Sequence, residues 1–178
     1  MSAKLAVSRR IRATPYTPRV EALGVSDYSV VNHTVLPKGF GRSTADDYWH
    51  LREHVQIWDV SCQRQVQLRG PDAARLTQLM TPRNLQTAKT GQCLYVPIID
   101  NHAGMINDPV LLKLADDHYW LSIADSDVAL WAGGIAQGMG LDVTVDEPDV
   151  APLAIQGPKA EDLMAQLFGE EVRACDQQ

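Results

Sequence analysis

Two similar hexapeptides, 87 residues apart, constrain the fold of this chain more than any other feature. Residues 68–73 and 155–160 each end a predicted strand with a Gly-Pro step and open a predicted helix that carries two leucines. Because proline is common at the first position of a helix, two Gly-Pro steps can also arise by chance. A duplicated unit would account for the strand and the leucines as well, and it predicts two related α/β halves.

The second of these halves is expected to be incomplete. In the first half, three predicted strands and a helix follow the Gly-Pro helix, but only the polar residues 169–178 follow the second one. The chain is therefore expected to stop inside its second half, with the Leu163 and Leu167 face of the last helix uncovered. Such a face favours self-association, which leaves a homodimer open. We expect an irregular N-terminal arm over residues 1–42 and an incomplete domain over residues 43–178.

Capping residues and hydrophobic periodicity predict the individual elements. Ser43 is a good N-cap, and acidic residues follow it in the first helical turn. Helices are predicted over residues 43–55, 70–80, 126–138 and 157–168. Strands are predicted over residues 57–60, 65–69, 92–99, 105–114, 119–123, 141–145 and 153–155.

Composition excludes several classes of protein. The chain has 178 residues, of which 45% are hydrophobic, and a net charge of −6, which argues against a nucleic-acid binder. No run approaches 18 apolar residues, so no membrane span is expected. The first 20 residues carry five basic and no acidic side chains, but two prolines interrupt any transit helix, so an ordinary basic arm is favoured. Three cysteines without a CxxC pair fit a reducing cytoplasm, and Cys93 is expected in the core.

One short motif would suit a metal site. His50, Glu53 and His54 match the H-x-x-E-H pattern of some zinc peptidases, in which two histidines share a helical face. Two aspartates lie three and four residues before His50, so a solvated polar face explains the same pattern. The latter interpretation is favoured, and no metal is expected.

The segment from Tyr95 to Asp108 is the stronger candidate for a functional site. Tyr95 lies in an apolar strand, and the chain turns at Gly104 and returns through Asp108 to Pro109. A carboxylate in so apolar a strand is costly unless it is paired, and proline in a strand indicates an edge or a bulge. Bulges are frequent beside active sites. From composition alone, a local cap for a backbone donor is the favoured explanation of Asp108.

Several motifs, in this order, carry a resemblance to a known family. They are Trp58-Asp59-Val60-Ser61, Gly70-Pro71-Asp72-Ala73, Leu79-Met80-Thr81, Gly91-Gln92, Gly104-Met105-Ile106-Asn107-Asp108 and Leu153-Ala154-Ile155-Gln156-Gly157-Pro158-Lys159. The chain resembles the N-terminal part of the aminomethyltransferase family, which includes the folate-dependent T-protein of glycine cleavage. It resembles most the subgroup that demethylates dimethylsulfoniopropionate. The resemblance implies an α+β fold of two ferredoxin-like halves, here without the C-terminal barrel.

The chain departs from the glycine-cleavage branch at a few motif positions. These are Cys62-Gln63 for His-Met, Thr81-Pro82-Arg83 for Thr-Asn-Asp, Asn107 for the first of two acids, and Ala124 for an Asn after the third strand. The departures fit the demethylase subgroup and count against aminomethyl transfer. A glycine-cleavage-type enzyme, an aromatic O-demethylase and a non-catalytic folate-binding fragment remain alternatives.

The resemblance also implies an activity. It implies a cytoplasmic enzyme that moves a methyl group from dimethylsulfoniopropionate to N5 of tetrahydrofolate, with no nucleic-acid or membrane partner. Asp108 would be the catalytic residue that contacts the pterin, and Tyr95 would help to bind the folate. Trp49 and Trp58 could hold a sulfonium by cation–π attraction, although core packing is the simpler expectation for both.

Overall fold

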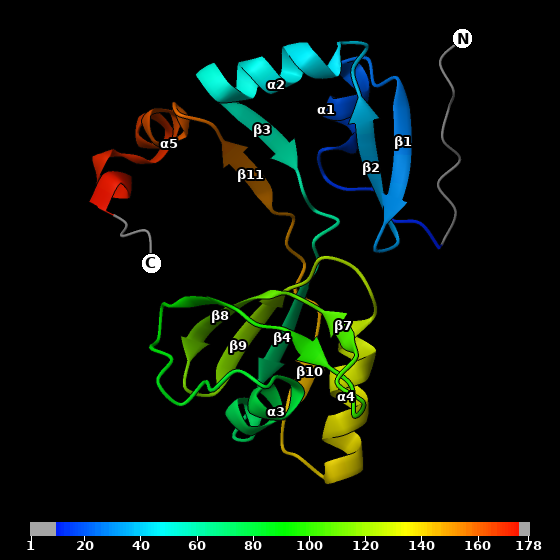
Figure 1. Cartoon of the computed structure of the whole chain (residues 1–178), viewed down its shortest axis with the longest axis vertical. Coiled ribbons are helices and arrows are strands. Elements are labelled where there is room, and N and C mark those ends of the chain that lie inside the picture. The colour runs from blue at the N-terminus through cyan, green and yellow to red at the C-terminus, as the bar shows by residue number, and fades with distance from the viewer. Residues whose placement is uncertain (1–9, 175–178) are drawn as a thin grey trace. The chain divides into compact units, whose positions relative to one another are not determined.

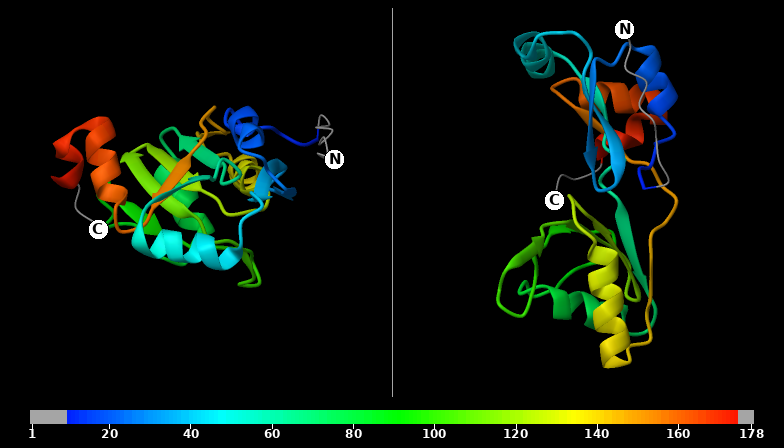
Figure 2. Two further views of the ribbon diagram at one scale, coloured as in Figure 1. Left: turned by 90° about the horizontal axis from the view of Figure 1, so that it is seen from above. Right: turned by 90° about the vertical axis from the view of Figure 1, so that its right-hand side faces the viewer.

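The computed structural model describes residues 10–174, which form two compact units (Figure 1). One unit consists of residues 63–150, and the other consists of residues 10–62 together with residues 151–174. The chain therefore passes between the units twice, at residues 62–63 and 150–151 (Figure 2). No helix among the described residues combines the length and the apolar character needed to cross a membrane.

The unit formed by residues 63–150 is built on a five-stranded antiparallel sheet with the order β10-β4-β9-β8-β5. Its strands are β4 (Gln65–Arg69), β5 (Cys93–Tyr95), β8 (Val110–Ala115), β9 (His118–Ser122) and β10 (Thr144–Asp146). Its helices are α3 (Ala73–Met80) and α4 (Val128–Met139), and a small ribbon pairs β6 (Ile98–Ile99) with β7 (Met105–Asn107). Without β5 and the ribbon, the order β4-α3-β8-β9-α4-β10 is that of a ferredoxin-like fold.

Both helices of this unit contribute to one core on one face of the sheet. Val66 and Leu68 of β4 are fully buried, as are Leu76 of α3 and Ala132 of α4. Because side chains alternate along a strand, the residues before, between and after Val66 and Leu68 lie on the opposite face of the sheet. On β4 that face carries Gln65, Gln67 and Arg69 rather than apolar residues.

The other unit has two small antiparallel sheets. Its helices are α1 (Thr17–Ala22), α2 (Thr44–Glu53) and α5 (Ala160–Phe168), followed by the 3-10 helix η1 (Glu170–Ala174). Strand β1 (Asp27–Val31) pairs with β2 (Thr34–Gly39), and β3 (Gln56–Asp59) pairs with β11 (Leu153–Gln156). Ser43 caps α2, since its hydroxyl accepts a hydrogen bond from the Asp46 amide at 3.1 Å. This confirms the predicted start of that helix.

The two Gly-Pro steps occupy equivalent places in the two units. Gly70 and Gly157 both have left-handed backbones, with φ of 141° and 119°, and each follows the strand that precedes a helix. A Cβ atom on Gly70 would lie 2.6 Å from the Asp142 carbonyl oxygen, and one on Gly157 would overlap the His54 carbonyl. The Asp142 carbonyl accepts a hydrogen bond from the Asp72 amide at 3.1 Å, and the His54 carbonyl accepts one from the Lys159 amide at 3.2 Å. The interpretation of two related halves therefore has a structural basis in these turns.

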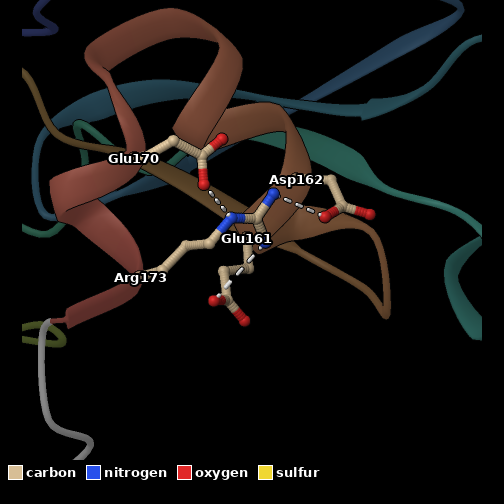
Figure 3. Close-up of polar contacts among 4 residues, drawn as sticks. All are labelled: Glu161, Asp162, Glu170 and Arg173. Carbon is tan, nitrogen blue, oxygen red and sulfur yellow. Dashed lines mark hydrogen bonds and ion pairs between the residues drawn. The ribbon is translucent and has the colours of Figure 1, made fainter.

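Arg173 ties η1 to the start of α5. Its guanidinium donates to Asp162 at 2.9 Å and to Glu170 at 2.7 Å, and Glu161 lies at 3.5 Å (Figure 3). These carboxylates, Asp162 first and Glu170 second, raise the pKa of Arg173. The three carboxylates are largely exposed and the Arg173 side chain is 37% exposed, so solvent screens the network.

The structure differs from the sequence expectations in several places. The helices expected to begin at residues 70 and 157 begin at Ala73 and Ala160. Residues 17–39, expected to be irregular, contain α1, β1 and β2. The strands expected over 92–99 and 105–114 are each interrupted, because the chain leaves the main sheet near Pro97 and Pro109, which cannot donate to a ladder. The expectation that Cys93 is a core residue is wrong, since Cys93 is exposed on the edge strand β5.

Candidate functional site

Tyr95 and Asp108 lie close together in the five-stranded unit. Tyr95 is the last residue of the edge strand β5, and its partner in the sheet is Val110, the first residue of β8. Asp108 lies between β7 and β8, at the point where the chain passes from the small ribbon into the main sheet. Pro109 follows it and is fully buried, and its carbonyl accepts a hydrogen bond from the Val96 amide at 3.0 Å.

The two side chains form a direct hydrogen bond. The Tyr95 hydroxyl donates to Oδ2 of Asp108 at 2.7 Å. This bond is the main cause that raises the pKa of Tyr95, since it stabilises the protonated phenol. Tyr95 is 55% exposed, and Oδ1 of Asp108 accepts no hydrogen bond from any described residue. The pair therefore presents an aromatic ring and a carboxylate oxygen with unused acceptor capacity.

The strand register places the pair on the sheet face opposite the helices. Tyr95, Val110 and Ser122 stand opposite one another on neighbouring strands, so they share that face. In the next row, Leu112 stands opposite Trp120, and Trp120 opposite Gln67. The surface next to Tyr95 is therefore partly apolar and partly aromatic.

Gln67 holds the aromatic part of this face in place. Its side-chain oxygen, Oε1, accepts hydrogen bonds from Nε1 of Trp120 at 2.9 Å and from Nε2 of His118 at 2.8 Å. Its amide nitrogen donates to Asp146 at 2.7 Å, which fixes which end of the amide faces the rings. The network spans β9, β4 and β10, and it keeps the Trp120 ring in one orientation.

Arg83 reaches the site from the loop that follows α3. Its guanidinium donates to the backbone carbonyl of Tyr95. The loop is held by Gln78, whose side-chain amide donates to the Arg83 carbonyl at 2.9 Å, and by the Thr81 hydroxyl, which accepts from the Arg83 amide at 3.3 Å. Arg83 thus brings a positive charge to the strand that carries Tyr95.

Comparison with known proteins places the chain in a family. The family described as the GCVT N-terminal domain matches residues 17–177. The chain belongs to this family. It is also 55% identical, over 166 residues, to the protein named dimethylsulfoniopropionate demethylase DmdA from Ruegeria pomeroyi. The match covers 93% of this chain and 45% of that protein, so the chain spans about half the length of this curated relative.

A solved structure shows the same fold. The glycine cleavage system aminomethyltransferase T from Bartonella henselae matches with a TM-score of 0.78, over 88% of this chain and 43% of that one. The sequence identity is 23%, so this likeness concerns the fold alone. It confirms the α+β class and the relation to the aminomethyltransferase fold.

His50, Glu53 and His54 belong to no cluster of three or more potential metal ligands among the described residues. The rings of His50 and His54 lie 4.9 Å apart. However, Nδ1 of His54 lies 2.8 Å from the Lys159 ammonium, and Nδ1 of His50 lies 3.5 Å from the Gln56 amide. Glu53 is exposed. Both histidines of this helix face thus have polar side chains as neighbours.

Trp49 and Trp58 were expected to pack in a core, and this expectation is wrong for the described chain. Trp49 is 59% exposed and contacts Tyr48 edge to face, and Trp58 is 46% exposed on β3. The sequence analysis identified Tyr95 and Asp108 but not the roles of Arg83 and Gln67. The alternation of polar and apolar residues in β4 was the available signal for Gln67, because it marks a sheet face without helices.

Proposed function

We propose that the protein transfers a methyl group from dimethylsulfoniopropionate to N5 of tetrahydrofolate. The observation that carries this proposal is the Tyr95–Asp108 pair, with its 2.7 Å hydrogen bond and an exposed ring beside a carboxylate. The 55% identity to a relative named as a dimethylsulfoniopropionate demethylase supports the choice of methyl donor. The partners are then small molecules, namely the donor and the folate.

Asp108 and Tyr95 suit the binding of a folate ring. A pterin presents N–H donors along one edge, and Oδ1 of Asp108 can accept from them while Oδ2 holds the tyrosine. The Tyr95 ring, fixed by that hydrogen bond, offers a flat apolar surface for stacking. Tetrahydrofolate supplies the nucleophilic nitrogen that accepts the methyl group.

The chemistry asks more of positioning than of acid catalysis. Methyl transfer would form a bond between the acceptor nitrogen and the methyl carbon as the bond between sulfur and that carbon breaks. Sulfur would keep the electron pair of the broken bond, and the proton of the acceptor nitrogen would go to solvent. A sulfonium leaves readily, so alignment of donor and acceptor is the main contribution, and such alignment is worth on the order of 7–11 kcal/mol. Asp108 would give the folate site a fixed negative charge, which favours the positive charge that develops on the acceptor nitrogen.

The test uses the protein expressed from its complete coding sequence. Asp108→Ala should lower folate-dependent demethylation about a hundredfold, as the loss of one charge-stabilising group does elsewhere. The matched control, Asp117→Ala, removes an exposed carboxylate from the turn between β8 and β9 and should leave the rate unchanged. A normal rate in Asp108→Ala would remove Asp108 from the mechanism, and inhibition by a chelator would instead point to His50 and His54.

The donor is tested separately. Dimethylsulfoniopropionate, an aminomethyl donor and a methoxy-aromatic acid are compared at equal concentrations with tetrahydrofolate. We expect the sulfonium to react fastest. Faster reaction of either other donor would assign the chain to a glycine-cleavage-type enzyme or to an O-demethylase. Folate binding without turnover of any donor would indicate a non-catalytic binding module.

A further inference from the structure

Asn107, the residue before Asp108, joins two segments of the five-stranded unit. It is 6% exposed and lies at the end of β7. Its side-chain amide donates to the Asp125 carbonyl and to the Ser126 hydroxyl, the latter at 3.2 Å. Its side-chain oxygen accepts from the Ala124 amide at 3.3 Å. Both ends of one amide thus bind the segment that follows β9.

The segment held by Asn107 has a backbone that needs support. Ser126 has a φ of 79°, a left-handed conformation that non-glycine residues seldom adopt. Its hydroxyl donates to the Ile106 carbonyl at 3.2 Å, so the contact between the segment and β7 is made from both sides. Asn107, Ile106 and residues 124–126 therefore form one hydrogen-bonded clamp.

We propose that Asn107 is a positioning residue that sets the orientation of Asp108 toward Tyr95. Successive side chains in an extended chain point to opposite sides, so anchoring Asn107 inward directs Asp108 outward. The buried Pro109 anchors the residue on the other side. Asp108 is thus flanked by two fixed neighbours, and Tyr95 lies within 2.7 Å of its carboxylate. The part that Asn107 plays in catalysis rests on the proposed function.

The residue type at position 107 matters for this clamp. An amide can donate to a carbonyl and accept from an N–H group at the same time, whereas an ionised carboxylate can only accept. The sequence departs from the glycine-cleavage branch at both Asn107 and Ala124, and the structure joins these two positions by a hydrogen bond. That bond uses the backbone amide of residue 124, so it bears on the residue type at position 107 and not on the one at position 124.

The first test measures the Tyr95–Asp108 contact in this chain without any assay of activity. The phenol of each tyrosine is titrated by NMR of ¹³C-labelled tyrosine, and Tyr95→Phe identifies the signal of Tyr95. Since the bond to Asp108 raises the pKa of Tyr95, Asn107→Ala should lower that pKa toward the value found in Asp108→Ala. Asn101→Ala, at the exposed turn of the same hairpin, should leave it unchanged. An unchanged Tyr95 titration in Asn107→Ala would overturn the proposal.

A second variant covers the case in which Asn107→Ala does not fold. Ser126→Gly removes the hydroxyl partner of Asn107, while glycine accepts the left-handed backbone without strain, so the fold should be retained. It should shift the Tyr95 titration in the same direction, by a smaller amount. If Ser126→Gly is folded and titrates like the unaltered protein while Asn107→Ala is unfolded, Asn107 supports the fold only and the proposal fails.

The last test measures catalysis in the protein expressed from its complete coding sequence. Asn107→Ala should lower kcat/KM for tetrahydrofolate about tenfold, because small displacements of catalytic groups are costly. The KM for the methyl donor should stay the same. An equal loss of kcat/KM for tetrahydrofolate and for the methyl donor would indicate general damage to the fold and would contradict a positioning role for Asn107. If the unaltered protein shows no folate-dependent transfer, the proposed function fails, while the titration still decides the role of Asn107.

Discussion

At the scale of single residues, Gly70 shows how closely two backbones approach. Its φ of 141° and the Asp142 carbonyl, 2.6 Å from where a Cβ would lie, leave no room for a side chain. We expect Gly70→Ala to lower the free energy of unfolding by about 1–3 kcal/mol or more. Gly134→Ala, in α4 with open space around the added atom, should raise it by about 0.5–1 kcal/mol. Urea denaturation measures the free energy of unfolding of both variants. Equal changes in the two variants would contradict the conclusion that Gly70 has no room for a side chain.

Tyr95 gives a prediction about pH at the same scale. Its pKa is raised in the folded protein, chiefly by the hydrogen bond to Asp108. Above a pH of about 10 the unfolded chain loses the phenolic proton that the folded chain retains. The stability that Tyr95 contributes is therefore complete below this pH, and it is lost as the pH rises to the raised pKa. Tyr95→Phe should show a smaller loss of stability in this window, measured as the denaturation midpoint at pH 9 and above 10.

At the scale of elements, α2 depends on its cap. Its first turn is held by the Ser43 hydroxyl, which accepts from the Asp46 amide at 3.1 Å, and none of its residues is buried. A helix with so little packing relies on local interactions. Ser43→Ala should therefore destabilise its unit by about 1 kcal/mol, whereas Ser43→Asp, which keeps a capping oxygen, should not. Thermal melts followed by circular dichroism compare the two variants.

At the scale of the whole chain, apolar side chains remain exposed in the unit formed by residues 10–62 and 151–174. Leu167 is 59% exposed and Phe168 is 63% exposed at the end of α5, and Trp58 is 46% exposed on β3. Exposed apolar groups of this kind favour association. We expect the 178-residue chain to self-associate with increasing concentration.

A charge at the end of α5 tests this expectation. Burying one large apolar side chain contributes about 1.5–3 kcal/mol, so Leu167→Lys should raise the dissociation constant about ten- to a hundredfold. Leu23→Lys serves as the control, because Leu23 is 73% exposed and follows a short helix elsewhere in the same unit. Sedimentation velocity at several concentrations measures the effect. A chain that stays monomeric throughout would contradict the prediction.

The parts of the fold that the sequence predicted are those set by local interactions. The position of the Ser43 cap could be read directly, because it lies next to the helix that it starts. The Gly-Pro steps marked the other two helix starts less closely, since the first helical residues are Ala73 and Ala160 and not the prolines. Strand β4 has its predicted bounds, because its alternating pattern needs only one buried face. Tyr95 and Asp108 could be named as a pair because one hairpin brings them together and a family resemblance supports them.

Tertiary structure decided the features that join distant parts of the chain. The pairing of β3 with β11, the division into two units and the contact of Asn107 with Ala124 depend on which surfaces meet. Cys93 and Trp58 are apolar or weakly polar in sequence, yet their exposure depends on the edge and the face that they occupy. Capping and turn preferences act within a few residues, whereas burial is a property of the assembled sheet. The sequence by itself therefore determined where most elements lie, and the packing decided which of their residues could form a site.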